Sequence, residues 1–288
     1  MTAAILDGTA AAAAIREELA ARTANLPQLS LAVVLVGEDP ASAVYVRNKE
    51  KACKKAGIRS IAHRLPADTS KEDLLALVAT LNANPEIDGI LVQLPLPGHL
   101  PERGILDAIV PEKDVDGFHP VNQGRVLLGD REALAPCTPA GIMELLHRNG
   151  HDVSGRRAVV VGRSTIVGRP LAALLISASA TVTICHTKTR DLAAEVARAE
   201  FLFVAAGRRD VVKPEWITPG CVVVDVGIHR LDDGTLTGDL DFAPCAERAA
   251  AITPVPGGIG PMTIAMLLSN TVRAGISRRG LTDEDKSR

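Results

Sequence analysis

Short apolar runs rich in β-branched residues alternate with helical patterns along most of this chain, and this alternation strongly constrains its fold. In the first half, predicted strands and predicted helices follow one another at 31–37, 41–56, 60–66, 71–83 and 89–97. Nearly continuous apolar strands separated by helices are typical of a parallel sheet that helices cover on both faces. The sequence therefore predicts an α/β fold, in which ligands bind beyond the carboxyl ends of the strands.

A second α/β series begins near residue 140, so we expect two α/β domains. Its predicted elements are strand 156–162, helix 169–178, strand 181–186, helix 190–199, strands 201–207 and 221–227, and a final helix from about Thr263. A hairpin is predicted at 230–242, because Asp233-Gly234 suits a tight turn. The stretch 98–140 is rich in Pro, Gly and Asp, and we expect it to carry the domain boundary.

Composition and charge exclude several classes of function. A net charge of -2 and a pI near 6.4 leave no basic excess for a nucleic-acid backbone. No apolar run approaches the ~18 residues that a membrane span needs, and the N-terminus lacks the basic start of a signal peptide. The five cysteines form no C-x-x-C pair, and the histidine spacings fit no metal motif. We therefore expect a cytoplasmic protein without a nucleic-acid, membrane or metal partner.

Tyr45, the only tyrosine, lies four residues before Lys49 in the helix that Asp39-Pro40 should start. Positions i and i+4 share one face of a helix, so the ring and the amine should project into the same space. This pair could form a substrate pocket with a stacking surface and a titratable group. Alternatively, it is a tyrosine at a helix boundary next to a solvated lysine, which is the commoner case for an isolated pair.

The segment VVVGRSTIVGRP lies at the first strand-to-helix turn of the second domain, where a dinucleotide fold places its phosphate loop. Gly162 permits a tight turn, Ser164 can cap the following helix, and Gly168 lets that helix approach the strand. A glycine-bearing turn of this kind without a phosphate ligand is also common. The next strand ends in His-Thr-Lys-Thr-Arg at 186–190, and Arg163 lies nearby. These hydroxyls and cations suit a 2′-phosphate, which favours NADP over NAD, although such residues can also be merely solvated.

Two loops complete the candidate site. Asp116 within PEKDVDGFHPVN could bind paired N–H donors of a heterocycle, or the segment could form an ordinary Asx turn. In TPVPGGIGPMT, Gly257, Gly258 and Gly260 allow the backbone to approach a flat ligand, or they could serve only the turns of the loop.

Taken together and in this order, these segments resemble the FolD family of bifunctional methylenetetrahydrofolate dehydrogenase/cyclohydrolases. The matching blocks extend from about residue 40 to about 265, and they are YVRNKEKACKKAGI, GILVQLPLP, PEKDVDGFHPVN, PCTPAGI, VVVGRSTIVGRP, TVTICHTKT, VVVDVGI and TPVPGGIGPMT. The resemblance implies a folate-binding α/β domain at 1–138, completed by a C-terminal helix at 263–280. This domain should face a Rossmann-type NADP-binding domain at 139–262 across a cleft, and a flexible tail is expected at 281–288.

The resemblance also implies the reaction. NADP should oxidise 5,10-methylenetetrahydrofolate to the 5,10-methenyl form, and hydrolysis in the same cleft should then give 10-formyltetrahydrofolate. Such an enzyme serves one-carbon metabolism and purine biosynthesis. The family further implies a homodimer that forms through the NADP domain.

The roles of individual residues follow from the same resemblance. It implies that Tyr45 stacks on the aminobenzoyl portion, Lys49 is the catalytic amine, Gln93 hydrogen-bonds this lysine, and Asp116 anchors the pterin. Further expected substrate contacts are Pro256, Gly257, Gly258, Gly260 and Pro261. Expected cofactor contacts are Gly162, Arg163, Ser164, Ile166, Val167, Gly168, Thr187, Gly227 and Ile228.

Two alternatives from other classes share the nucleotide-binding half. A two-domain NADP-dependent dehydrogenase of the amino-acid or shikimate type would not require Tyr45, Lys49, Gln93 and Asp116 together. A non-enzymatic nucleotide sensor would keep the loop at 162–168 and should tolerate loss of the Lys49 amine.

Overall fold

The computed structural model describes residues 3–281, and the chain folds into two compact units. Unit 1 comprises Met1–Ala12, Val126–Gly129 and Thr138–Thr263, and unit 2 comprises Ala13–Arg125, Asp130–Cys137 and Ile264–Arg288. Helices α1 (Gly8–Thr23) and α10 (Ile259–Arg279) each begin in unit 1 and continue in unit 2. The predicted tail lies outside the described residues from position 282 onward.

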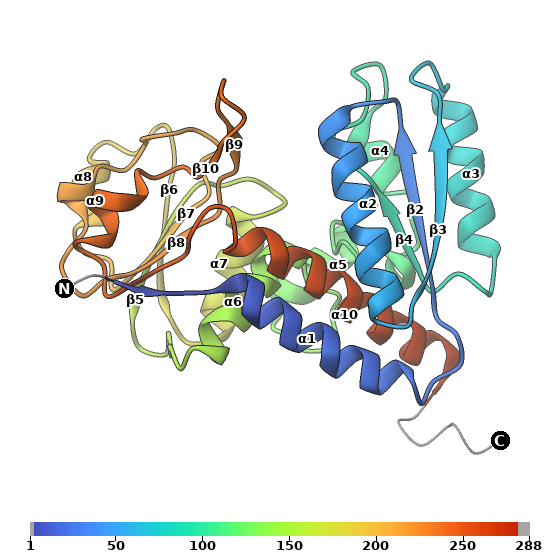
Figure 1. Cartoon of the computed structure of the whole chain (residues 1–288), viewed down its shortest axis with the longest axis horizontal. Coiled ribbons are helices and arrows are strands. Elements are labelled where there is room, and N and C mark those ends of the chain that lie inside the picture. Colours follow the sequence, from blue (N-terminus) through green and yellow to red (C-terminus); the bar gives the residue numbers. More distant parts are fainter. Residues whose placement is uncertain (1–2, 282–288) are drawn as a thin grey trace. The chain divides into compact units, whose positions relative to one another are not determined.

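Unit 2 contains a three-stranded parallel sheet with β2 in its centre (Figure 1). Its strands are β2 (Ser30–Val36), β3 (Arg59–Leu65) and β4 (Gly89–Val92). Every residue of β2 is buried, as expected for a strand covered on both faces. Strand β4 ends before the predicted limit of 97, because Pro95 and Pro97 have no N–H to donate to a ladder.

Helices α2 (Pro40–Lys55) and α3 (Lys71–Ala83) accompany this sheet, and side-chain caps start both of them. The Asp39 carboxylate accepts from the Ser42 N–H at 2.7 Å, as the sequence predicts for a cap at this position. The Ser70 hydroxyl accepts from the Asp73 N–H at 3.1 Å. These caps fix the residues at which α2 and α3 begin after the carboxyl ends of β2 and β3. They therefore help to position the side chains of α2.

A buried lysine closes the other end of α3. Lys113 is 2% exposed, and its Nζ donates to the carbonyls of Leu81, Asn82 and Asn84 at 3.0, 2.7 and 2.7 Å. The last carbonyls of a helix have no intrahelical donors, and a cation near them also opposes the negative end of the helix dipole. Lys113 therefore ties the segment that precedes Asp116 to the end of α3.

Unit 1 contains a six-stranded parallel sheet in the order β1-β11-β8-β7-β5-β6 (Figure 1). Its strands are β1 (Ala4–Ile5), β5 (Arg157–Val161), β6 (Thr181–Cys185), β7 (Phe201–Val204), β8 (Val222–Asp225) and β11 (Ala251–Ile252). The predicted α/β class with parallel sheets is confirmed. Strand β6 lies on one side of β5 and β7 on the other, so the strand order reverses at β5. In open α/β sheets, dinucleotides bind at the carboxyl ends of the strands at such a reversal.

The predicted hairpin is present but shorter than expected. Strands β9 (His229–Arg230) and β10 (Leu236–Thr237) pair antiparallel, and Phe242 already belongs to α9 (Phe242–Ala246). Helix α10 starts at Ile259, four residues before the predicted Thr263, because a proline is tolerated in the first turn of a helix. The remaining elements are α4 (Glu102–Leu106), η1 (Pro111–Lys113), α5 (Pro120–Leu127), α6 (Cys137–Arg148), α7 (Gly168–Ser177), α8 (Leu192–Val196) and η2 (Pro214–Trp216).

Within residues 3–281, no helix combines the length and the apolar character that crossing a membrane requires. The same residues contain no group of three or more His, Cys, Asp or Glu side chains that could hold a metal ion.

Candidate active site

Unit 2 brings an amine and an amide together at the carboxyl end of β4. Lys49, in α2, is 7% exposed, and its Nζ donates to Gln93 Oε1 at 3.0 Å. Gln93 directly follows β4, and its own Nε2 donates to the Leu94 carbonyl at 2.6 Å. Both hydrogen-bonding groups of the amide are therefore engaged, which fixes the oxygen toward the amine. Gln93 holds Lys49 without adding a charge.

Tyr45 lies one helical turn before Lys49, and the Lys49 Nζ is 6.0 Å from the centre of its ring. The ring is half-buried, and burial raises the pKa of its hydroxyl. The i and i+4 spacing thus places the ring and the amine in the same space, as the sequence predicts.

Asp116 adds a carboxyl group in the electrostatic field of the same lysine. Burial raises its pKa to about 6, the nearby Lys49 charge lowers it, and the Asp114 carboxylate raises it again. A carboxylate, an amine and an amide from three different segments of unit 2 therefore form one polar group. It can offer a hydrogen-bond acceptor to N–H donors and an amine for proton transfer.

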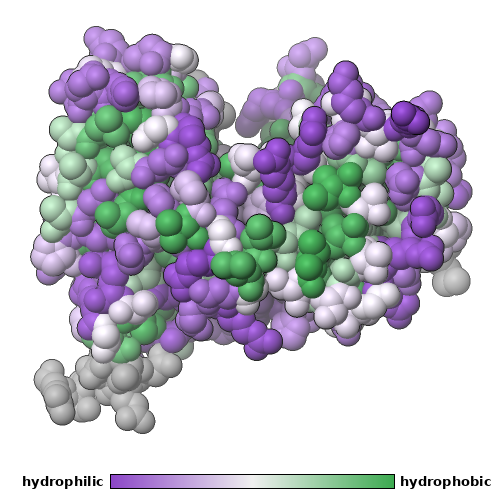
Figure 2. Space-filling model, turned by 180° about the vertical axis from the view of Figure 1, so that it is seen from behind, coloured by the Kyte–Doolittle hydropathy of each residue, from purple (hydrophilic) through white to green (hydrophobic). Residues whose placement is uncertain are grey.

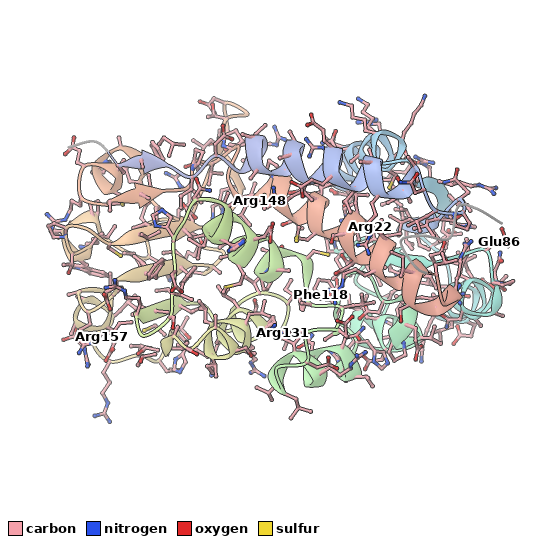
Figure 3. All side chains as sticks on the ribbon, turned by 90° about the horizontal axis from the view of Figure 1, so that it is seen from below. Arg22, Glu86, Phe118, Arg131, Arg148 and Arg157 are labelled. Atoms are coloured by element: carbon pink, nitrogen blue, oxygen red, sulfur yellow. The ribbon has the colours of Figure 1, made fainter. Side chains whose placement is uncertain are left out.

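Asp114, rather than Asp116, makes the turn that the sequence left open. It is 2% exposed, and its carboxylate accepts from the N–H groups of Phe118 and His119 at 3.2 and 2.8 Å and from Asn122 Nδ2 at 2.9 Å. Phe118 leads from this turn into α5 (Figure 3). Because Asp114 satisfies the turn, the carboxyl group of Asp116 remains available to a ligand.

Two residues that sequence reasoning missed support the backbone beside Asp116. Asn270, on α10, is 4% exposed, and its Nδ2 donates to the carbonyls of Val115 and Ala135, each at 2.9 Å. The Cys137 thiol donates to the Val115 carbonyl at 3.2 Å, and burial raises the pKa of this thiol. No sequence motif indicates these contacts, because Asn270 and Val115 are 155 positions apart.

In unit 1, the loop 162–168 connects β5 to α7 and has the shape of a phosphate-binding turn. Gly162 has φ +131, and a Cβ there would collide with the Ala205 carbonyl, while a Cβ at Gly168 would collide with the Gly162 carbonyl. The Ser164 hydroxyl accepts from the N–H groups of Val167 and Gly168 at 3.1 and 3.3 Å. The side chains of Arg163, Ser164, Thr165 and Ile166 are exposed. These glycines and the start of α7 fit a dinucleotide pyrophosphate.

The turn after β6 presents the predicted hydroxyl and cations. The His186 N–H donates to the Thr189 hydroxyl at 2.9 Å, and the Lys188 N–H donates to His186 Nδ1 at 3.1 Å. Thr187 and Lys188 are exposed within this turn, and Arg190 is exposed directly after it. The chemistry of the turn fits a 2′-phosphate, which needs donors and positive charge.

The other predicted contacts of unit 1 lie in two further segments. Gly227 is buried and Ile228 is 47% exposed directly beyond β8. Gly257 has φ +105, and its carbonyl accepts from the Thr9 N–H at 2.9 Å. The remaining residues of that motif divide between loop and helix, with Pro256 and Gly258 before α10, and Gly260 and Pro261 within its first turn.

Comparisons with known proteins identify one family over most of the chain. Residues 6–116 match the family model "Tetrahydrofolate dehydrogenase/cyclohydrolase, catalytic domain", and residues 136–279 match its "NAD(P)-binding domain". The chain is 58% identical to the "Bifunctional protein FolD" of Acidiphilium cryptum, over 97% of this chain and all of that protein.

Two solved structures are also similar over nearly the whole chain. The bifunctional enzyme FolD from Campylobacter jejuni is 47% identical with a TM-score of 0.93, and the match covers 95% of this chain and 99% of that chain. The methylenetetrahydrofolate dehydrogenase-cyclohydrolase of Trypanosoma brucei, complexed with NADP cofactor and inhibitor, is 39% identical with a TM-score of 0.92, and the match covers 96% and 98%.

Proposed function

This chain belongs to the tetrahydrofolate dehydrogenase/cyclohydrolase family, and from that premise we propose how its residues perform the two reactions. The enzyme oxidises 5,10-methylenetetrahydrofolate to 5,10-methenyltetrahydrofolate with NADP and then hydrolyses the product to 10-formyltetrahydrofolate. The single observation that carries this assignment of residues is the buried Lys49 amine, which Gln93 holds at 3.0 Å beside Asp116. The family also argues against a dehydrogenase of the amino-acid or shikimate type and against a non-enzymatic nucleotide sensor.

The residues of unit 2 bind and orient the folate. Asp116 accepts hydrogen bonds from the N–H groups of the pterin, and the Tyr45 ring stacks on the aminobenzoyl portion. When bound, NADP supplies the acceptor for the hydride that leaves the one-carbon bridge. The oxidation needs no protein base, so the contribution of the protein to it is orientation.

Hydrolysis requires proton transfer, which is the role of Lys49. Water adds to the methenyl carbon, and the amine accepts a proton from the attacking water. The tetrahedral adduct then collapses as its bond to one folate nitrogen breaks, and the ammonium returns the proton to that nitrogen. The hydroxyl of the adduct becomes the formyl carbonyl and releases its proton to solvent, so that the positive charge of the methenyl form leaves as one proton. Gln93 keeps the amine pointed at this site and adds no charge.

The cofactor contacts belong to unit 1. The loop residues Gly162, Arg163, Ser164, Ile166, Val167 and Gly168 would hold the pyrophosphate of NADP, Thr187 would contact its 2′-phosphate, and Gly227 and Ile228 would contact its nicotinamide. The ordered turn at 186–189 and its exposed cations support NADP over NAD. Pro256, Gly257, Gly258, Gly260 and Pro261 are proposed as further folate contacts.

Domain boundaries, assembly and location complete the proposal. The folate-binding domain spans 1–138 with the helix 263–280, and the NADP domain spans 139–262. We infer a homodimer through the NADP domain, because β6 is an edge strand and Ile176 and Ile184 are 59% and 40% exposed. Apolar side chains also form patches on the surface of unit 1 (Figure 2). The enzyme acts in the cytoplasm and supplies one-carbon units for purine biosynthesis.

Reduced-nicotinamide absorbance tests the reaction directly. With NADP, the purified protein should reduce the cofactor in the presence of methylenetetrahydrofolate but not of shikimate or amino acids. Absence of reduction with the folate would reject the proposal. Lys49→Gln and Lys49→Met should abolish hydrolysis of methenyltetrahydrofolate while NADP binding stays largely intact, and a variant that hydrolyses at the wild-type rate would exclude Lys49 as the acid/base.

A further inference from the structure

A fully buried carboxylate joins two loops of unit 1 at the end of its sheet. Asp239 is 0% exposed, and its Oδ2 accepts from the N–H groups of Ala206 and Gly207 at 2.7 and 3.0 Å. Its Oδ1 lies 2.7 Å from His229 Nε2, which can donate to it. Both oxygens are therefore occupied by donors that come from outside the segment carrying Asp239.

A second buried carboxylate holds the first one in place. Asp225 is the last residue of β8, and its Oδ1 accepts from the N–H groups of Gly227 and Asp239 at 3.0 and 2.9 Å. Its Oδ2 accepts from the Leu240 N–H at 2.9 Å. Asp225, at the end of β8, thus holds the backbone at Asp239 and Leu240. The 227–229 segment follows the same strand end.

Gly227 shows how closely the carboxylate packs against this segment. A Cβ at Gly227 would collide with Asp239 Oδ1, and a Cβ at Gly238 would collide with the Asp225 carboxylate. The glycine that we propose as a cofactor contact is therefore also the residue that leaves room for Asp239. The Asp239 carboxylate therefore packs directly against the backbone of Gly227.

The partners of Asp239 lie beyond two adjacent strands of the larger sheet. Ala206 and Gly207 follow β7, whereas Gly227 and His229 follow β8, so all of them lie at the carboxyl ends of adjacent strands. This is the edge of a doubly wound sheet where dinucleotides bind. Through these hydrogen bonds, Asp239 links the segments that follow the two strands.

We propose that Asp239 is a positioning residue for hydride transfer, which fixes the 205–207 and 227–229 loops around the nicotinamide, with His229 as its outer partner. The inference rests on the proposed function, in which Gly227 and Ile228 contact NADP. Hydride transfer requires the reacting atoms to lie about 3–3.5 Å apart, and a displacement of about 1 Å can lower the rate ~100-fold. Hydrolysis of the methenyl form involves no hydride, so it should not depend on these loops.

The hydrolysis rate of each variant is the control for its dehydrogenase rate. Asp239→Ala should lower the dehydrogenase kcat by ~100-fold, because three donors lose their acceptor and the two loops separate. The rate of hydrolysis of added methenyltetrahydrofolate without NADP should stay within about twofold of the wild-type rate, because hydrolysis does not depend on these loops. The dissociation constant of NADP should rise less than kcat falls, because the 162–168 loop is unchanged.

Two further variants keep the test decisive if Asp239→Ala fails to fold. His229→Ala removes a partly exposed donor and should lower the dehydrogenase kcat by about tenfold, and His229→Gln should restore much of it because its amide can donate to Asp239. Asp233→Asn, at the exposed hairpin turn, is the matched control and should leave both activities unchanged.

Equal losses of both activities, or an unchanged dehydrogenase kcat in Asp239→Ala or His229→Ala, would overturn the inference. A wild-type enzyme that does not reduce NADP with methylenetetrahydrofolate would instead refute the proposed function, so the two failures are distinguishable.

Discussion

Replacing Asp116 by asparagine should stabilise the folded protein while it removes folate turnover. Burial raises the pKa of Asp116 to about 6, against an ordinary value of 3.8, and the Lys49 charge only partly opposes this. Between these two values the folded state keeps a proton that the unfolded chain has lost. The free energy of unfolding is therefore highest below pH 3.8, falls as the pH rises to 6, and stays at the lower level above pH 6.

The size of the change in the free energy of unfolding follows from the difference between the two pKa values. A pKa raised from 3.8 to about 6 lowers the free energy of unfolding by about 3 kcal/mol at pH 8. At pH 5, the unfolded carboxyl is mostly ionised and the folded one mostly protonated, so the loss is about 1.5 kcal/mol. Asparagine has nearly the same shape and does not titrate. It should therefore add about 3 kcal/mol of stability at pH 8 and about half of that at pH 5.

Urea unfolding of the wild type and the variant at pH 5 and pH 8 measures this gain in the free energy of unfolding. Hydrogen exchange of peptides from unit 2 monitors the unfolding. Trp216, the only tryptophan, lies in unit 1, so its fluorescence reports the unfolding of that unit separately. Folate turnover should be lost in parallel, because the amide cannot provide a charged acceptor. A variant less stable than the wild type at pH 8, or one with the same gain at both pH values, would refute this account of Asp116.

Three further substitutions test a structural contact, the NADP-binding loop and the partner of the Lys49 amine. Lys113→Met should lower the free energy of unfolding by about 2–4 kcal/mol, because three carbonyls lose their donor; a urea midpoint equal to that of the wild type would contradict it. Gly162→Ala should abolish NADP binding, measured by calorimetry, since its Cβ would collide with the Ala205 carbonyl, yet hydrolysis of the methenyl form should persist. Gln93→Glu should slow that hydrolysis at least tenfold, because a carboxylate keeps Lys49 protonated; wild-type stopped-flow rates would exclude a requirement for a neutral partner.

The sequence predicted most of the features that depend on local spacing. Helix α2 begins at its Asp39 cap, and the i and i+4 spacing brings Tyr45 and Lys49 together. The strands of the larger sheet lie at the predicted runs, because β-branched segments between helices have few other ways to bury themselves. Strands β1 and β11 are the exceptions, since segments of two residues carry no periodicity, and these two strands pair with each other beside β8.

Features that depend on distant parts of the chain were not predictable in this way. The contact of Asn270 with Val115 spans 155 positions, and that of Asp239 with Ala206 spans 33. Neither residue type, alone in a sequence, indicates such a partner. Residue spacing alone did not show which acid of the 111–122 segment makes the turn, because only the folded backbone reveals that the Asp114 carboxylate accepts from the Phe118 and His119 N–H groups.

Neither unit is encoded by one continuous stretch of the gene, since each is assembled from three separate segments. The first twelve residues supply the β1 edge of one sheet, while the following residues continue as the same helix in the other unit. A gene fragment for either half would therefore lack part of its own fold. Recombination that exchanged one half for a foreign nucleotide-binding module would have to splice within α1 and within α10.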